Sequence, residues 1–233
     1  MAEHTDEKKL KMVFFDLDGV IFDVGGYREA GQKVATSSWH VLFDYLGMLG
    51  EHKRLKQLFA SNYFPSYMEW TDEACRVLQR HGLSEGDLID CFGARHYMPG
   101  VKETFAELKR RGYSCAIITG SLAYVADRAA SELGIDEVVA HCELFFDPAG
   151  KLENWRLTPC DYADKTVYFH RLVRRNGLRS DQCSYVGDEV NDIPLFEEAG
   201  LSIAFNSHKA SVQEAAHVVI TKPDLREILQ YLE

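Results

Sequence analysis

The sequence lacks several features that would narrow its class at once. No apolar run approaches 18 residues, so a membrane-spanning helix is not expected. The polar start, residues 1–11, lacks the apolar segment of a signal peptide. The six cysteines form no C-x-x-C pair, which favours reduced core residues of a cytoplasmic protein over a disulfide framework. Positive charge is also in deficit, with 26 basic against 36 acidic residues and a net charge of −10, which argues against nucleic acid as a partner. The oligomeric state cannot be inferred from the sequence.

The most informative feature present is a pair of aspartates, Asp16 and Asp18, at the end of the apolar run 12–15. Such a run predicts a buried strand, and the carboxyl ends of strands are where open α/β sheets bind ligands. Residues two apart project to the same side of an extended chain. The pair could therefore address one metal ion or one substrate.

From about residue 99 onward, segments with strand and helix patterns alternate. Predicted strands cover 114–119, 183–186, 201–205 and 218–220, and helical patterns lie between them, with a hairpin turn at 148–150. This alternation predicts parallel β-α-β units, and hence an α/β three-layer sandwich with a central, mainly parallel sheet.

Residues 23–98 differ, because their apolar groups all have helical spacing and no convincing strand interrupts them. We expect a small, all-helical cap domain at 23–98, inserted into a core made of 1–22 and 99–233. The alternative is that these helices extend a single core. The insertion leaves directly after the Asp pair, so a cap rooted there would sit over the carboxyl end of the sheet.

A second acidic cluster follows the predicted strand 183–186, in the segment G-D-E-V-N-D. Asp188 and Asp192 offer hard oxygen ligands, as Asp16 and Asp18 do, and Mg²⁺ prefers such ligands. Either residue alone could equally be a helix cap or a turn residue. Thr119-Gly120-Ser121 ends another strand and is expected to open a helix, where a hydroxyl and free N–H groups form an anion site. Lys165 is a candidate site residue only because crowded carboxylates and a phosphate would need a nearby cation.

Four segments in order, F-F-D-L-D-G-V-I-F, I-I-T-G-S, Asp164-Lys165 and Y-V-G-D-E-V-N-D, resemble the four motifs of the haloacid-dehalogenase-like (HAD) hydrolase superfamily. The resemblance covers the chain from Met12 to Asp192. The helical insertion after the first motif resembles the C1 type of cap. The spacing of the motifs is most similar to the phosphoserine-phosphatase-like branch.

The resemblance implies a role for each motif residue. Asp16 would be the nucleophile that forms an aspartyl-phosphate, and Asp18 the general acid and base. Mg²⁺ would be held by Asp16, the backbone carbonyl of Asp18 and Asp188, with Asp192 assisting through water or by orienting Lys165. The residues expected to bind the phosphoryl group or substrate are Thr119, Gly120, Lys165 and Asn191.

The implied activity is hydrolysis of a small phosphorylated metabolite, and Asp18 disfavours dehalogenases and transport ATPases, which lack an acid there. A sugar-phosphate mutase or another phosphotransferase stays open, as does, with less support, a non-catalytic phosphate-sensing protein.

The substrate is less defined than the reaction. Phosphoserine phosphatases usually read D-S-T after the first aspartate pair and carry a glutamate several residues later. Here Gly19-Val20 stands in place of the Ser-Thr, and Asp23 is displaced from the glutamate position by a few residues. Four further polar residues could read the substrate: Tyr27, Arg28, His40 and Arg95.

Overall fold

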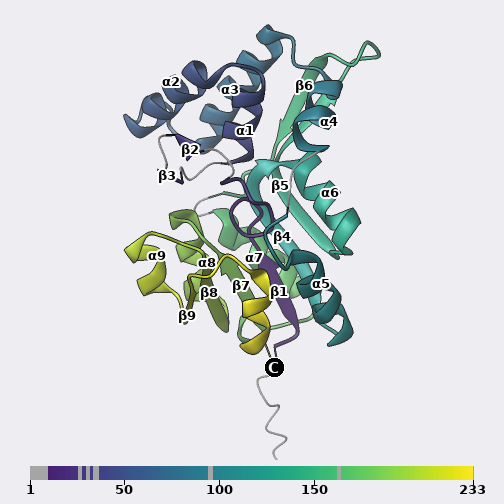
Figure 1. The fold of residues 1–233 in the computed structure, drawn as a ribbon, viewed down its shortest axis with the longest axis vertical. Coiled ribbons are helices and arrows are strands. Elements are labelled where there is room, and N and C mark those ends of the chain that lie inside the picture. Colours follow the sequence, from purple (N-terminus) through teal and green to yellow (C-terminus); the bar gives the residue numbers. More distant parts are fainter. Residues whose placement is uncertain are drawn as a thin grey trace, which may run out of the picture.

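The computed structural model describes residues 10–25, 28–29, 32–33, 37–93, 97–161 and 164–232. Its main sheet has seven strands in the order β6-β5-β4-β1-β7-β8-β9, all parallel except β6, which pairs antiparallel with β5 (Figure 1). The strands are β1 (Met12–Phe15), β4 (Ser114–Leu122), β5 (Glu137–Phe146), β6 (Leu152–Leu157), β7 (Cys183–Gly187), β8 (Leu201–Phe205) and β9 (Val218–Ile220). The predicted fold class is confirmed.

Helices cover both faces of this sheet. They are α5 (Val101–Arg110), α6 (Ala123–Leu133), α7 (Lys165–Arg175), α8 (Ile193–Glu198) and α9 (Ala210–Ala215), with short 3₁₀ turns at Ser180–Gln182, Val190–Asp192 and Leu225–Gln230. Side chains alternate along β1, so Val13 and Phe15 pack with α5 and α6, whereas Met12 and Phe14 pack with α7 and α8. The central strand is thus buried on both faces, as its unbroken apolar sequence predicts.

Helices α1 (Ser38–Tyr45), α2 (Leu49–Ala60), α3 (Tyr67–His81) and α4 (Glu85–Gly93) lie beyond the carboxyl ends of the strands, in the upper part of Figure 1. Two short strands, β2 (Arg28–Glu29) and β3 (Gln32–Lys33), precede them as an antiparallel pair. The expectation of no strand between 23 and 98 is therefore wrong. This polar segment carries no apolar alternation that would have revealed the strands.

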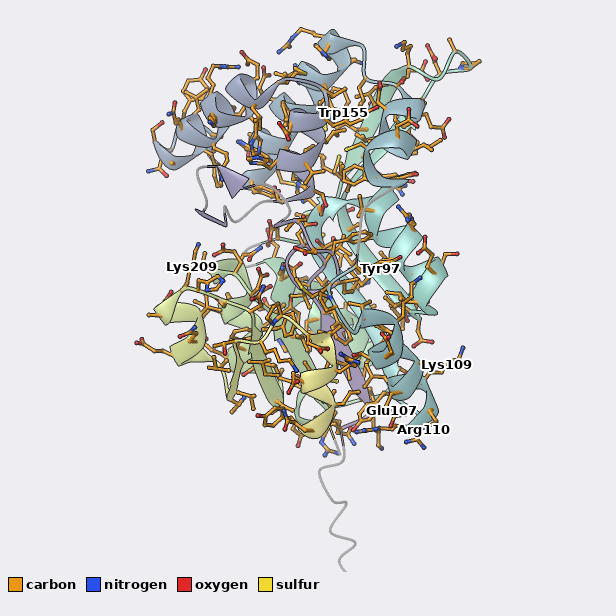
Figure 2. All side chains as sticks on the ribbon, in the orientation of Figure 1. Tyr97, Glu107, Lys109, Arg110, Trp155 and Lys209 are labelled. Carbon is orange, nitrogen blue, oxygen red and sulfur yellow. The ribbon has the colours of Figure 1, made fainter. Side chains whose placement is uncertain are left out.

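The chain enters and leaves the helical segment at one place. Phe22 forms an antiparallel bridge with Tyr97, and the Met98 N–H donates to the Ile21 carbonyl at 2.8 Å. The hairpin β5–β6 reaches up to the same helices, where the Trp155 indole donates to Asp72 on α3 at 2.9 Å (Figure 2). The helices therefore contact the core at a second point, and the division into a core (1–22, 99–233) and a cap (23–98) stays a prediction.

All six cysteines are buried and free of disulfides, as expected of reduced core residues. Among the described residues, no helix is both long and apolar enough to span a membrane.

The centre of the helical segment contains a buried histidine. His52 on α2 is 2% exposed, and its ring centroid lies 5.2 Å from that of His40 and 5.3 Å from that of Phe43. Its Nδ1 atom is buried without a hydrogen-bond partner among the described residues. Burial, followed by the nearby His40, lowers the pKa of His52 from 6.5 to about 4. His52 is thus neutral in the folded protein at neutral pH.

We expect His52 to make the protein less stable in mild acid. Between pH 6.5 and about 4, the unfolded chain binds a proton at this side chain and the folded chain does not. The free energy of unfolding therefore falls as pH drops through this window, by roughly 3 kcal/mol in total, and the contribution is constant below it. Denaturant unfolding at pH 7, 5.5 and 4 measures the effect. His52→Gln should flatten this part of the profile, and an unchanged slope in the variant would contradict the assignment.

Candidate active site

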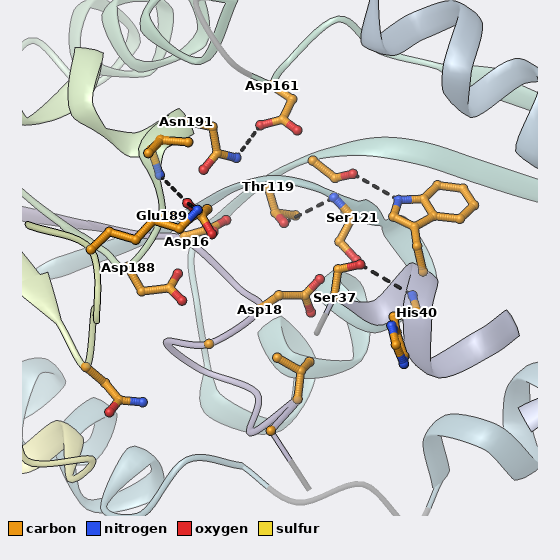
Figure 3. A pocket seen from close by; sticks show the side chains of 18 of the residues that line it. Asp16, Asp18, Ser37, His40, Thr119, Ser121, Asp161, Asp188, Glu189 and Asn191 are labelled. Atoms are coloured by element: carbon orange, nitrogen blue, oxygen red, sulfur yellow. Dashed lines mark hydrogen bonds and ion pairs between the residues drawn. The ribbon is translucent and has the colours of Figure 1, made fainter. Parts of the chain in front are cut away.

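The carboxyl ends of β1, β4 and β7 bring the predicted motifs together. Asp16 follows β1 directly, and its N–H donates to the Val186 carbonyl of β7 at 2.9 Å. Because β4 and β7 flank β1 in parallel, Thr119 and Asp188 reach the same edge of the sheet. A cavity of about 450 Å³ opens there, between the core and the helices above it (Figure 3).

Three aspartates lie close together at this edge. Ligand oxygens of Asp16, Asp188 and Asp192 lie within 4.8 Å of one another. Asp188 Oδ1 is buried without a hydrogen-bond partner among the described residues. Burial, and then the nearby Asp16 and Asp192 carboxylates, raise the pKa of Asp188 well above its usual value. A buried carboxylate oxygen with no donor, beside other carboxylates, is the donor set that a hard cation requires.

The backbone at Gly19 permits this arrangement. Gly19 has a φ of +84°, in the left-handed region, and a Cβ atom there would lie 2.2 Å from Asp188 Oδ2. Only glycine has both the conformational freedom and the missing side chain that this contact requires. The D-G sequence after the first strand therefore makes room for the second acidic cluster.

A buried lysine bridges two of the carboxylates. Lys165, at the start of α7, is fully buried, and its Nζ lies 3.2 Å from Asp16 Oδ1 and 2.7 Å from Asp192 Oδ1. Burial alone would lower the pKa of Lys165, but Asp16 and Asp192 hold it well above its usual value. The lysine is therefore a permanent cation beside Asp16.

Asp192 is fully occupied by protein donors. Its Oδ1 accepts from Lys165 and from the Tyr185 hydroxyl at 2.8 Å, and its Oδ2 accepts from the N–H groups of Asp188 and Glu189 at 3.0 and 3.1 Å. These contacts suit a residue that orients Lys165 and the loop of Asp188. Tyr185 was missed by the sequence reasoning because it sits inside the predicted strand as an ordinary core aromatic.

The environment of Asp16 disfavours its charge even with Lys165 beside it. Burial raises the pKa of Asp16 to about 8 against the opposing effect of Lys165, and Asp192 and Asp18 add to the rise. Lys165 alone thus does not balance the cluster. A divalent cation bound by Asp16 and Asp188 would keep both carboxylates ionised at neutral pH.

Thr119 and Ser121 lie at the site, but not at a helix start. Strand β4 continues to Leu122 and α6 begins at Ala123, so the prediction that T-G-S opens the helix is wrong. The register with β5 shifts between Thr119 and Leu122, and such irregularities re-aim side chains. Thr119 Oγ1 accepts from the Ser121 N–H at 3.2 Å. Both side chains are 2% exposed.

Gly120 allows a close approach from another loop. A Cβ atom there would lie 2.1 Å from Asp161 Oδ2. The other oxygen of Asp161 accepts from Asn191 Nδ2 at 2.6 Å, and Asn191 Oδ1 is buried without a partner among the described residues. Asp161 thus holds Asn191 at the edge of the cavity. No motif in the sequence pointed to Asp161.

The helices above the sheet contribute the upper wall of the cavity. Trp39 Nε1 and the Tyr67 hydroxyl both donate to the Gly120 carbonyl, at 3.3 and 3.0 Å. His40 and Lys56 also line the cavity, as does Asp23 from the linker. Of the other candidate substrate-recognition residues, Tyr27 and Arg95 lie outside the described residues, and Arg28 is described only as part of β2.

Asp18 faces the helical segment. Its two carboxylate oxygens accept from the N–H and the hydroxyl of Ser38, at 2.8 and 2.5 Å. Burial raises the pKa of Asp18, against hydrogen bonds from Ser38 and a contribution from the Ser121 hydroxyl. Asp16 and Asp18 thus have different partners, Lys165 for the first and α1 for the second.

The sequence and fold of this chain are similar to those of known phosphatases. The family model for haloacid dehalogenase-like hydrolases matches residues 13–197. A phosphoserine phosphatase of Methanocaldococcus jannaschii is 34% identical over 58% of this chain and 63% of its own length. One from Streptococcus thermophilus is 32% identical over 68% of this chain and 73% of its own length. A third, from Albidiferax ferrireducens, is 26% identical over 96% of this chain and 90% of its own length.

Solved structures agree with the sequence matches. The structure of a substrate-bound phosphoserine phosphatase superposes with a TM-score of 0.78 at 25% identity, covering 97% of this chain and all of that one. A structure of a phospho-aspartyl intermediate analogue of phosphoserine phosphatase gives a TM-score of 0.77 at 25% identity, with the same coverage. Together these matches support a phosphatase with a HAD-like core. The chain therefore belongs to the haloacid dehalogenase-like hydrolase family.

Proposed function

We propose that the protein is a Mg²⁺-dependent phosphomonoester hydrolase that works through an aspartyl-phosphate on Asp16. The observation that carries this proposal is the position of Asp16, held between a permanently charged Lys165 and a cluster of carboxylates suited to a cation. A carboxylate that attacks a phosphate dianion meets like-charge repulsion, so positive charge must surround both reactants. Lys165 supplies part of that charge, and a cation bound by the carboxylates would supply the rest.

In the proposed reaction, Asp16 attacks phosphorus and the bond from phosphorus to the ester oxygen breaks. Asp18 gives its proton to the departing oxygen. Asp18 then takes a proton from a water molecule, whose oxygen attacks phosphorus and releases inorganic phosphate, which restores Asp16. Thr119, the Gly120 N–H and Lys165 bind the phosphoryl oxygens, and Asn191 assists from the opposite loop.

The orphaned oxygen of Asp188 and the carboxylates around it fit a magnesium ion. Mg²⁺ would be held by Asp16, the main-chain carbonyl of Asp18 and Asp188, and Asp192 would orient Lys165 beside it. When bound, the ion neutralises negative charge on the phosphoryl group. Lys165 would screen the same charge.

Phosphoserine is the first candidate substrate, among small metabolites expected in the cytoplasm. It carries an ammonium and a carboxylate beside its phosphate, and the cavity is lined by acidic and basic side chains that could pair with these two groups. Asp23 and Lys56 both line the cavity. The sequence after Asp18 differs from the usual phosphoserine phosphatase pattern, so Asp23 would take the part of the usual glutamate and Lys56 would bind the carboxylate.

The decisive experiment measures phosphate release from a panel of phosphorylated metabolites, with phosphoserine, sugar phosphates and nucleotides included. Activity should vanish with EDTA and return with Mg²⁺. Added alcohols test the alternative of a phosphotransferase, because they would then take up the phosphoryl group in competition with water. Activity that survives complete removal of divalent metal would overturn the proposal.

Lys56→Gln should weaken binding of phosphoserine more than its turnover. Loss of one charge-assisted contact costs about 1.5–3 kcal/mol, which corresponds to a rise in KM of about tenfold or more, with kcat little changed. Asp23→Asn should act similarly through the ammonium group. Steady-state kinetics with phosphoserine and with a phosphate ester lacking both charged groups provide the comparison. Equal KM increases for both substrates would remove the two residues from substrate recognition.

A further inference from the structure

The carboxylate of Asp18 is held by a residue of the helical segment rather than of the core. Ser38 is the first residue of α1, it is 1% exposed, and it donates both its N–H and its hydroxyl to Asp18. Each donor goes to a different carboxylate oxygen. The Ser121 hydroxyl, buried on the core side, makes no hydrogen bond of ordinary geometry among the described residues. Asp18 therefore owes its fixed orientation chiefly to Ser38.

The position of α1 is itself fixed against the core. Trp39, the next residue, and Tyr67 at the start of α3 both donate to the Gly120 carbonyl on β4. The Tyr67 and Trp70 rings stack at 5.2 Å with 11° between their planes, and Trp70 meets Trp39 edge-on at 5.7 Å. These aromatic contacts tie α1 to α3. The Ser38 donors can thus reach Asp18 only when this helical unit is docked on β4.

Docking also satisfies groups that would otherwise lack partners. The first N–H groups of a helix have no acceptor within the helix, and the N–H of Ser38 is one of them. The helix N-terminus also favours a negative charge in front of it. When α1 withdraws, Asp18 loses both Ser38 donors, and its side chain, which has two rotatable bonds, is then less constrained. Docking and the orientation of Asp18 are therefore one event.

We propose that Ser38 is a positioning residue that aligns Asp18 for proton transfer only when the helical segment is docked, so that closure over the substrate switches on acid–base catalysis. This inference rests on the proposed function. It adds a residue from outside the four motifs to the catalytic arrangement. Trp39 and Tyr67 set the position of α1, and Ser38 transmits that position to the carboxylate.

The test uses Ser38→Ala with two esters in rapid-mixing kinetics. The first ester is p-nitrophenyl phosphate, whose leaving group, p-nitrophenolate, departs without a proton. The rate of its first, stoichiometric release should therefore stay within about threefold of the wild type. The steady-state rate should fall by at least about tenfold, because activation of water still needs Asp18. With an alkyl phosphate, the first step should slow by a similar factor, because the alkoxide needs a proton. KM should fall together with the steady-state rate for the p-nitrophenyl ester, because only its second step slows, and should change little for the alkyl ester, because both of its steps slow. Ser38→Thr, which keeps the hydroxyl, should restore both steps.

Ser66→Ala is the matched control, because it removes the N-cap hydroxyl of α3, whose hydrogen bonds among the described residues are with Met68 and Glu69 and not with Asp18. It should leave the kinetic pattern as in the wild type. Equal slowing of both esters at every step, with a raised KM, would show that Ser38 only supports the structure and would overturn the inference. So would unchanged kinetics in Ser38→Ala. An inactive wild-type protein, or an active Asp16→Asn variant, would instead overturn the proposed function.

Discussion

Asp16→Asn is expected to reduce phosphatase activity by at least about 10⁴-fold, because an amide cannot form the phosphoryl-enzyme and removal of a nucleophile commonly costs more than this. The substitution keeps the shape of the side chain and the backbone contact to Val186. Steady-state phosphate release measures the loss. Mass spectrometry of acid-quenched protein should detect an added phosphoryl group on the wild type and none on the variant.

A matched control for this substitution is Asp90→Asn, which changes an exposed aspartate on α4. It should retain the activity of the wild type. Full phosphatase activity in Asp16→Asn, with a circular dichroism spectrum like that of the wild type, would exclude Asp16 as the nucleophile.

Lys165→Met is expected to damage both catalysis and folding. Removal of one partner from a buried ion pair leaves uncompensated charge, which typically lowers the free energy of unfolding by about 3–5 kcal/mol. Here two carboxylates, Asp16 and Asp192, lose their common cation. The activity of the folded fraction should fall by about 10²–10³-fold, because one preorganised donor to the transferring group is lost. Urea unfolding and phosphate release give the two readings.

The comparison for Lys165 is Lys222→Met, which removes an exposed lysine that pairs with Glu227 and Asp224. Solvent screens that pair, so its loss should change neither stability nor activity measurably. A stability of Lys165→Met equal to that of the wild type would mean that the buried carboxylates are neutralised in another way, and would weaken the proposed role of the lysine.

The core fold could be predicted from the sequence because its signals are local and periodic. The apolar run before Asp16 and the alternation after residue 99 both reflect strands that are buried along their whole length. Such strands leave the same pattern in any sequence that contains them. The same logic placed Asp188 at the end of a strand, and the pairing of β7 with β1 then brings it to Asp16. The local sequence pattern gave a wrong prediction where the end of a strand is set by its pairing with a neighbouring strand. At Thr119-Gly120-Ser121, pairing with β5 continues β4 past the point where the sequence suggested a helix.

The other half of the site could not be predicted, because it depends on contacts between distant segments. Ser38 is an unremarkable helix-start serine in the sequence, and Tyr67 and Trp39 have the spacing of ordinary core aromatics. Only docking of their helices on β4 gives them the Gly120 carbonyl and Asp18 as partners. Asp161 likewise reaches Asn191 from 30 positions away. The four motifs therefore describe the chemistry, and the inserted helices decide how one of its residues is aimed.

The place of β1 in the sheet has a consequence for how the protein folds. Met12 pairs with Ser114 and with Cys183, which are 102 and 171 positions later in the chain (114 − 12 and 183 − 12). Such distant pairing makes formation of the sheet centre slow, and it delays completion until most of the chain has left the ribosome. Until β7 has been made, the apolar strand β1 can pair only with β4, on one side. A chain that ends before β7 would thus lack part of the active site and leave one edge of this apolar strand unpaired.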